Sequence, residues 1–282
     1  MRINGRTRVV GVWGHPVAHS RSPVMQNAAL LEMGLDWIYV PFDVDPERAD
    51  VAVAAIRAMN MIGVNVTVPL KERVPAYLDV VDPAAARIGS VNTIHNVDGE
   101  LRGYSTDGPG FLRALGAVGW PEANQAVYVI GAGGSARAIA FALAERGNRL
   151  LIANRTAQRA DALVDAVNQA FTGAAAATPW GDAPVTDTID IVLNTTSLGM
   201  HPREGECPPV PEGLLRSGMR VYDLVYAPTE TVLLRRAREA GCETSNGLGM
   251  LVQQGALALS LWTGIGVDDL PVAVMEAAVR AV

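Results

Sequence analysis

The most constraining stretch of this sequence runs from residue 127 to residue 138, Val-Tyr-Val-Ile-Gly-Ala-Gly-Gly-Ser-Ala-Arg-Ala. Four apolar residues lead into a glycine cluster and then a helical pattern, which predicts a buried strand, a tight turn and a helix N-terminus. Gly131 permits the turn, Gly133 lets a phosphate approach the backbone because it has no Cβ, and Ala136 is small enough for helix and strand to pack closely. Glycines after a strand are often only a turn, but here the elements come in the order that a dinucleotide-binding domain requires.

The next apolar run, residues 149–153, predicts a second strand of that domain. An NAD site usually has Asp or Glu at the end of this strand, where the carboxylate binds the ribose 2′-hydroxyl. Here the chain continues with Asn154, Arg155, Thr156, Ala157, Gln158 and Arg159. Two guanidinium groups and a hydroxyl are suited to hold a 2′-phosphate, so the segment favours NADP over NAD. The alternative is that Asn154 and Thr156 only cap the next helix and that the arginines are solvated.

Composition limits the class of protein. A chain of 282 residues suits two domains, and a net charge of −6 without a basic run argues against general nucleic-acid binding. No segment has the apolar length of a membrane span and the N-terminus lacks a signal-peptide pattern, so we expect a soluble cytoplasmic protein with no membrane partner. Cys207 and Cys242 lie far apart without a nearby His, so we predict neither a metal site nor a disulfide framework.

The first third of the chain predicts alternating strands and helices. Residues 7–13 form the first strand, followed by a loop that contains Ser20 and Ser22. Ser22 either caps a helix that runs to Met33 or, with Ser20, receives a substrate carboxylate at the helix N-terminus. The pattern then predicts a strand at 37–42, a helix at 46–59, a third strand from 63, and a helix with a loop at 75–85.

Polar residues follow these strands. Asn65 and Thr67 are two residues apart and therefore share one face of the third strand, and Lys71 stands just past its end, where open α/β sheets bind ligands. A single Lys in a loop is otherwise an ordinary surface charge. Asp98-Gly99 predicts a hairpin turn, and Asp107 is either a helix N-cap or part of a site.

In the dinucleotide domain we predict strands near 127–130, 149–153, 189–194 and 220–225. Residues 194–200, including Thr195, follow the third of these, at the place where the nicotinamide half of a dinucleotide lies. Residues 173–177 mark a variable connection. Helices are predicted at 109–118, 229–240, 250–263 and 271–281.

Taken together, these stretches resemble the shikimate dehydrogenase family over essentially the whole chain. The matching stretches are residues 14–23, 65–72, 91–93, 103–110, 131–134, 154–156, 222–228 and 246–252. Seven or more motifs in the same order are far more specific than any one of them.

The resemblance implies an α/β enzyme of two domains with its active site in the cleft between them. An N-terminal α/β substrate-binding domain would span residues 1–107, completed by helices at about 248–282, and a Rossmann-like NADP-binding domain would span 120–245. The implied reaction is the reversible reduction of 3-dehydroshikimate to shikimate by NADPH. The cofactor would be NADP, with NAD as a possible secondary cofactor, and the protein would be a monomer or a homodimer.

The resemblance also implies residue roles. Lys71 and Asp107 would be the catalytic pair, with Tyr226 beside them as a further substrate-binding residue. The substrate carboxylate would bind Ser20 and Ser22, and the ring hydroxyls would bind Thr67, Asn92, Asp107 and Gln254. The cofactor would contact Gly131, Ala132, Gly133, Gly134, Ser135, Ala136, Asn154, Arg155, Thr156, Arg159, Thr195 and Gly247. Residue chemistry agrees, since a partly desolvated lysine beside a carboxylate can relay the proton that alcohol oxidation releases, without a metal.

The sequence departs from the family pattern at three places near the expected substrate site. Gln26 stands where the family usually has His, Ser105 where it has Asn, and Ser90 where it has Ala. One alternative is therefore a related enzyme acting on quinate, aminoshikimate or a similar cyclic hydroxy acid. An alternative of another class is a non-catalytic NADP-binding regulator. A folate-type dehydrogenase of similar layout lacks support from the paired serines and from the Asn-Arg-Thr segment.

Overall fold

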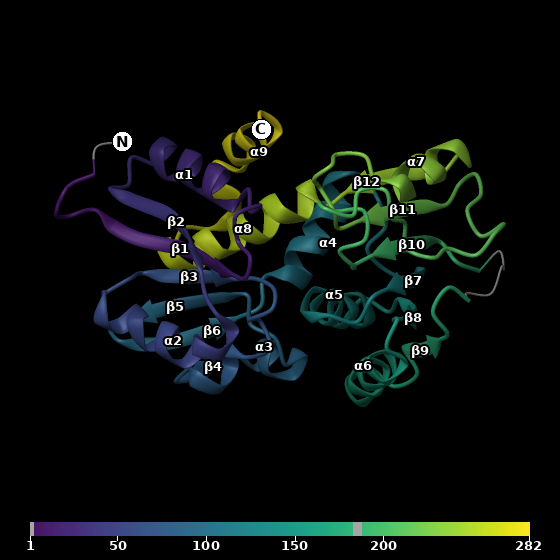
Figure 1. Cartoon of the computed structure of the whole chain (residues 1–282), viewed down its shortest axis with the longest axis horizontal. Helices are drawn as coiled ribbons and strands as arrows, with labels where there is room; N and C mark the ends of the chain where they lie inside the picture. Colours follow the sequence, from purple (N-terminus) through teal and green to yellow (C-terminus); the bar gives the residue numbers. More distant parts are fainter. Residues whose placement is uncertain (1–2, 183–187) are drawn as a thin grey trace. The chain divides into compact units, whose positions relative to one another are not determined.

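A computed structural model describes residues 3–182 and 188–282. The chain divides into two compact units, one of Met1–Gly110 with Leu251–Val282 and one of Phe111–Met250. Each unit contains one six-stranded sheet with helices packed against it (Figure 1). The predicted α/β class is confirmed.

The first unit has a mixed sheet. Its strands are β1 (Arg8–Gly14), β2 (Trp37–Asp43), β3 (Gly63–Val66), β4 (Val80–Val81), β5 (Thr93–Val97) and β6 (Glu100–Tyr104), in the spatial order β2-β1-β3-β5-β6-β4. β1 pairs in parallel with β2 and β3, whereas β5 is antiparallel to both β3 and β6. The β5–β6 turn is the predicted hairpin, in which Asp98 and Gly99 have φ of 53° and 93°, as a two-residue turn with left-handed residues requires.

Helices connect and cover these strands. They are α1 (Ser22–Glu32), α2 (Ala49–Ala58), α3 (Pro83–Ile88), α8 (Leu248–Thr263, of which residues 251–263 belong to this unit) and α9 (Val272–Arg280), with short 3₁₀ turns at Pro46–Arg48, Val74–Tyr77 and Val267–Asp269. Helix α4 (Asp107–Ala117) begins in this unit, and its residues from Phe111 onward belong to the second unit. The last helix, α9, lies beside α1 (Figure 1). Apolar side chains from β1, α2, β3, β5 and β6 form one buried core, to which Trp13, Ile56, Val64, Ile94 and Leu101 contribute.

Two local expectations for this unit are wrong. The helix and loop predicted at 75–85 are instead a 3₁₀ turn, the strand β4 and the start of α3, whose N-cap Asp82 accepts hydrogen bonds from the amides of Ala84 and Ala85. Ser22 is not an N-cap either. It is the first residue of α1, and the N-cap position belongs to Arg21, which makes no capping hydrogen bond through its side chain.

The second unit has a fully parallel sheet. Its strands are β7 (Ala126–Ile130), β8 (Arg149–Ala153), β9 (Ala175–Thr178), β10 (Ile191–Asn194), β11 (Arg220–Asp223) and β12 (Glu243–Asn246). The spatial order is β12-β11-β10-β7-β8-β9. From β7 the chain adds β8 and β9 on one side and then β10, β11 and β12 on the other side, so the strand order reverses between β7 and β10. This is the doubly wound order of dinucleotide-binding sheets. The helices α5 (Gly134–Glu145) and α6 (Ala157–Ala170) lie beside β8, and α7 (Val232–Glu239) lies beside β11 and β12 (Figure 1).

Two edge strands escaped prediction. The variable connection expected at 173–177 is largely β9, an alanine-rich strand with weak β propensity. It forms because it pairs with β8 and because the Asn168 side chain hydrogen-bonds both the N–H and the C=O of Ala175. The other edge strand, β12, is entirely polar in sequence and is held by pairing with β11.

Candidate functional site

Lys71 and Asp107 form a buried ion pair in the first unit. Lys71 lies in the turn after β3, and Asp107 is the first residue of α4. Lys71 Nζ is 2.5 Å from Asp107 Oδ2, and the two residues are only 8% and 4% exposed. They are 36 positions apart in sequence. They meet because Val91, next to β5, donates from its amide to the carbonyl oxygen of Lys71, and Asp107 follows the partner strand β6.

Lys71 is also the only lysine among the 23 lysines and arginines of the sequence. Arginine serves as the cation everywhere else in the chain, and it would make a stronger bidentate pair with a carboxylate. The one lysine of the sequence therefore stands in a buried ion pair with a carboxylate, where an arginine would make the stronger bidentate pair.

Asn92 holds the aspartate of this pair. Its Nδ2 donates to Asp107 Oδ1 at 2.7 Å and to Thr106 Oγ1 at 2.9 Å, and its Oδ1 accepts from the Thr106 amide at 2.8 Å. A longer contact of 3.4 Å joins Nδ2 to Gln254 Oε1. Four of the predicted site residues, Lys71, Asn92, Asp107 and Gln254, thus belong to one hydrogen-bonded cluster.

Two of the remaining predicted substrate residues of this unit, Ser20 and Thr67, lie in loops, and Ser22 is the first residue of α1. Ser20 Oγ accepts from the amide of Ser22 at 3.3 Å, so the two serines are adjacent at the N-terminus of α1. Thr67 is half-buried and its amide donates to the carbonyl oxygen of Trp13. Gly14 lies directly against Thr67, because a Cβ at Gly14 would stand 2.6 Å from Thr67 Cγ2.

The three departures from the family pattern do not disturb this cluster. Gln26 is fully buried and donates from Nε2 to the carbonyl oxygen of Gly255 at 2.9 Å, so it joins α1 to α8. Ser90 is 1% exposed, and Ser105 is half-buried beside Thr106.

The glycine turn of the second unit has the geometry that a pyrophosphate site needs. Gly131 has a φ of 116°, and a Cβ there would stand 2.3 Å from Thr195 Oγ1, so only glycine fits. Gly133 is different, because a Cβ at this position would have no atom within 4 Å. Open space therefore faces Gly133 at the start of α5, where no N-cap side chain hydrogen-bonds to the first turn of the helix.

The predicted 2′-phosphate segment is exposed next to this turn. Asn154 Oδ1 accepts from the amide of Ala132 at 3.2 Å, which ties the end of β8 to the glycine turn. Arg155, Thr156 and Arg159 are exposed, and Thr156 makes no capping hydrogen bond through its side chain although it precedes α6. Among the described residues, neither arginine takes part in an ion pair.

The loops after β10, β11 and β12 carry the other predicted contacts. Thr195 Oγ1 donates to the carbonyl oxygen of Ile130 at 2.8 Å, which places it at the point where the strand order reverses. Gly247 lies against Leu224, whose carbonyl oxygen would be 1.9 Å from a Cβ at this position. Tyr226 is half-buried in the loop after β11.

Sequence reasoning missed a buried carboxylate at this edge of the sheet. Asp223 is fully buried at the end of β11 and accepts from Asn194 Nδ2 at 2.8 Å, Thr231 Oγ1 at 2.6 Å and the Val225 amide at 3.0 Å. No cation among the described residues pairs with it, and burial raises its pKa to about 6. The sequence signal that could have identified this buried carboxylate is an aspartate at the end of a mostly apolar strand. The bond to Val225 also explains why β11 ends at residue 223 instead of 225.

Because burial favours the protonated form, Asp223 lowers the stability of the fold as pH rises. The native pKa of about 6 exceeds the ordinary value of 3.8, so the native state binds the proton more tightly than the unfolded state. Between pH 4 and pH 7 the free energy of unfolding of the wild type should fall by about 2 kcal/mol relative to Asp223→Asn. Urea unfolding of both proteins at pH 4, 5.5 and 7 measures this difference. A difference that stays constant, or that grows in the other direction, would contradict this expectation.

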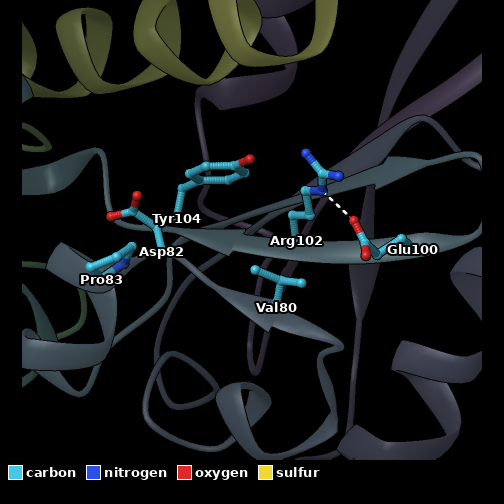
Figure 2. Close-up of a pocket in the computed structure, with 6 residues that line it drawn as sticks. All are labelled: Val80, Asp82, Pro83, Glu100, Arg102 and Tyr104. Atoms are coloured by element: carbon cyan, nitrogen blue, oxygen red, sulfur yellow. Dashed lines mark hydrogen bonds and ion pairs between the residues drawn. The ribbon is translucent and has the colours of Figure 1, made fainter.

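A pocket of about 240 Å³ also occurs in the first unit, beside β4 and β6. Figure 2 shows its lining residues, which are Val80, Asp82, Pro83, Glu100, Arg102 and Tyr104. None of them is a predicted site residue. Arg102 Nε donates to Glu100 Oε2 at 2.5 Å, and Asp82 caps α3, so the charged groups around this pocket are engaged with the protein itself.

Across residues 3–182 and 188–282, no group of three or more His, Cys, Asp or Glu side chains is placed to hold a metal ion. Over the same ranges, no helix combines the length and apolar character that crossing a membrane requires.

A doubly wound sheet with an open glycine turn, in one chain with a buried lysine and aspartate pair, is the architecture of a dinucleotide-dependent oxidoreductase. Family models agree in detail. Residues 12–94 match the shikimate dehydrogenase substrate binding domain, residues 119–197 match shikimate / quinate 5-dehydrogenase, and residues 247–280 match the shikimate 5′-dehydrogenase C-terminal domain.

Individual proteins match over nearly the full length. Shikimate dehydrogenase (NADP(+)) of Moorella thermoacetica is 48% identical, with 99% of this chain and 95% of that protein covered. A crystal structure of a shikimate dehydrogenase in complex with NADP+ is 41% identical, with a TM-score of 0.93 over 99% of this chain and 97% of that one. The Thermus thermophilus enzyme in complex with NADP(H) and shikimate is also 41% identical, with a TM-score of 0.87 over 98% and 99% of the two chains. The chain belongs to the shikimate dehydrogenase family, as the sequence motifs predicted.

Proposed function

We propose that this protein is an NADP-dependent shikimate dehydrogenase, which reversibly reduces 3-dehydroshikimate to shikimate. The observation that carries the proposal is the Lys71–Asp107 pair, since the only lysine of the chain is buried 2.5 Å from a buried carboxylate. An ion pair needed only for structure could use arginine. A group that must gain and lose a proton near neutral pH could not, because the guanidinium stays protonated.

In this proposal the pair moves the proton of the reaction. Lys71 Nζ gives a proton to the substrate oxygen that becomes the hydroxyl, and it takes the proton back in the reverse direction. Asp107 holds Nζ through Oδ2 and also orients the substrate through a hydrogen bond. The Asn92 amide supports this role, because it fixes the second oxygen, Oδ1, at 2.7 Å.

The residues of the second unit fit a bound dinucleotide phosphate. Gly131 and Gly133 would bring the backbone of residues 131–136 against the pyrophosphate, and the open space at Gly133 supports this assignment. Residues 154–156 with Arg159 would hold the 2′-phosphate, while Thr195 and Gly247 would contact the nicotinamide half. Bound NADPH supplies the hydride. The domain limits proposed for these roles are 1–107 with 248–282 for substrate and 120–245 for cofactor.

The substrate would bind in the first unit. We assign its carboxylate to the hydroxyls of Ser20 and Ser22, which are adjacent at the N-terminus of α1 and can donate to an anion there. Thr67, Asn92 and Gln254 would bind its ring hydroxyls, and we also assign Tyr226 to substrate binding. We further propose a cytoplasmic enzyme that works as a monomer or a homodimer.

The test is an absorbance assay of nicotinamide reduction that crosses shikimate and quinate with NADP and NAD. We expect strong turnover with shikimate and NADP. Preference for quinate, or for another cyclic hydroxy acid, would overturn the substrate assignment and direct attention to Gln26 and Ser105. Binding of NADP without turnover of any of these substrates would identify the non-catalytic regulator instead.

A further inference from the structure

A chain of buried hydrogen bonds connects β2 to the catalytic pair through the interior of the first unit. It begins at Tyr39, whose hydroxyl donates to Asn65 Oδ1 at 2.8 Å. Asn65 Nδ2 donates to Thr93 Oγ1 at 3.0 Å, and Thr93 Oγ1 donates to Asn92 Oδ1 at 3.1 Å. Asn92 then holds Asp107, so Tyr39 is linked to the reacting groups without lying among them.

The direction of these bonds is determined by chemistry. Asn65 Nδ2 also lies 3.3 Å from the carbonyl oxygen of Asn92, which can only accept a hydrogen bond. The amide nitrogen of Asn65 must therefore face that carbonyl, and its oxygen must face Tyr39. A donor is needed at Tyr39 to complete the arrangement. Burial raises the pKa of Tyr39 far above its ordinary value, so the phenol keeps its proton and remains a donor.

Tyr39 is itself held in place by α1. Asn27 donates from Nδ2 to the carbonyl oxygen of Tyr39 at 2.8 Å and accepts from its amide at 2.9 Å. The Ser22 side chain lowers the pKa of Tyr39, but by less than burial raises it. Tyr39, 1% exposed, is thus held by Asn27 of α1 through its backbone and joined to the network behind Asp107 through its hydroxyl.

We infer that Tyr39 is a positioning residue for this reaction, and that its hydroxyl fixes the orientation of the Asn65 carboxamide and thereby the substrate side of the catalytic cluster. Tyr39 touches neither substrate nor cofactor in this role. The inference rests on the proposed function only for the identity of the substrate.

Tyr39→Phe tests the inference, because it removes the hydroxyl and keeps the ring that packs against Trp262. We expect KM for shikimate to rise about tenfold, with kcat changed less than about threefold and KM for NADP unchanged. A purely structural role would reduce the active fraction, which would lower the apparent kcat and leave both KM values as they are. That result would overturn the inference.

Tyr128→Phe is the matched control. Tyr128 is another fully buried tyrosine, in β7, and its hydroxyl has no hydrogen-bond partner among the described residues. Removing that hydroxyl should leave KM for shikimate unchanged. An equal rise in both variants would mean that loss of any buried hydroxyl is enough, and would contradict a specific role for Tyr39.

A double-mutant cycle tests whether Tyr39 acts through Asn65. In an Asn65→Ala background, Tyr39→Phe should not raise KM further, whereas additive effects would refute this route. If Asn65→Ala does not fold, Asn65→Asp serves instead, because its carboxylate still accepts the hydrogen bond from Tyr39 but donates none to Thr93.

A readout without substrate separates this inference from the proposed function. The side-chain amide signals of Asn65 in a ¹H–¹⁵N spectrum should shift, and their protons should exchange faster, in Tyr39→Phe than in the wild type. If the wild type turns over no shikimate, the proposed function fails, and this measurement still decides the positioning role. Unchanged Asn65 signals would overturn it.

Discussion

Lys71→Arg is expected to lower kcat by about 10³-fold, even though it keeps the positive charge beside Asp107. The guanidinium stays protonated at neutral pH, so it cannot give a proton to the substrate oxygen or take one back. Steady-state assays with shikimate and NADP measure the loss of kcat. The Kd for NADP, measured by fluorescence titration, should remain within about twofold of the wild type, because the proposed cofactor residues lie in the other unit.

Arg73→Lys is the control for this substitution. Arg73 lies two residues further along the chain, is exposed and pairs with Glu47, so the conservative exchange there should leave kcat unchanged. A Lys71→Arg variant that keeps more than a tenth of the wild-type kcat would show that the site needs only a cation at residue 71. Lys71→Ala should lose as much activity, and it should also cost about 3–5 kcal/mol of stability because Asp107 is left buried without its partner.

Replacing Arg155 and Arg159 together by alanine is expected to lower kcat/KM for NADP by about 10³-fold while changing kcat/KM for NAD less than about threefold. Each guanidinium would contribute one charge-assisted hydrogen bond to the 2′-phosphate, and each such bond is worth about 1.5–3 kcal/mol. NAD has no 2′-phosphate and therefore loses nothing. Parallel assays with the two cofactors at saturating shikimate measure the effect.

Arg146→Ala is the matched control, because this arginine is likewise exposed, lies in the same unit and follows α5. It should change neither cofactor constant. Equal losses with NADP and NAD in the double variant would assign Arg155 and Arg159 to a part of the dinucleotide common to both. No loss with either cofactor would mean that the two arginines are ordinary solvated surface residues with no role in cofactor binding.

Most helices and strands of this protein could be predicted from short stretches of its sequence. The apolar run before Gly131 and the helical pattern after it predicted β7 and α5, and Asp98-Gly99 predicted the β5–β6 hairpin. These signals are local, because periodicity, turn residues and glycine act over a few positions. Strands without such a signal were missed. The alanine-rich β9 and the polar β12 owe their conformation to a neighbouring strand, which no short window of sequence contains.

The sequence by itself determined the family, the parallel dinucleotide sheet and the residue types of the site. Only the tertiary structure decided which of those residues meet. Lys71 and Asp107 come together because β3, β5 and β6 pair as antiparallel neighbours, and pairing between distant segments leaves no periodic trace in either one. The hydrogen bonds of Tyr39 and Asp223 are of the same kind. Each depends on burial next to partners far away in the chain, and burial is what makes an unpaired polar group costly and its partners necessary.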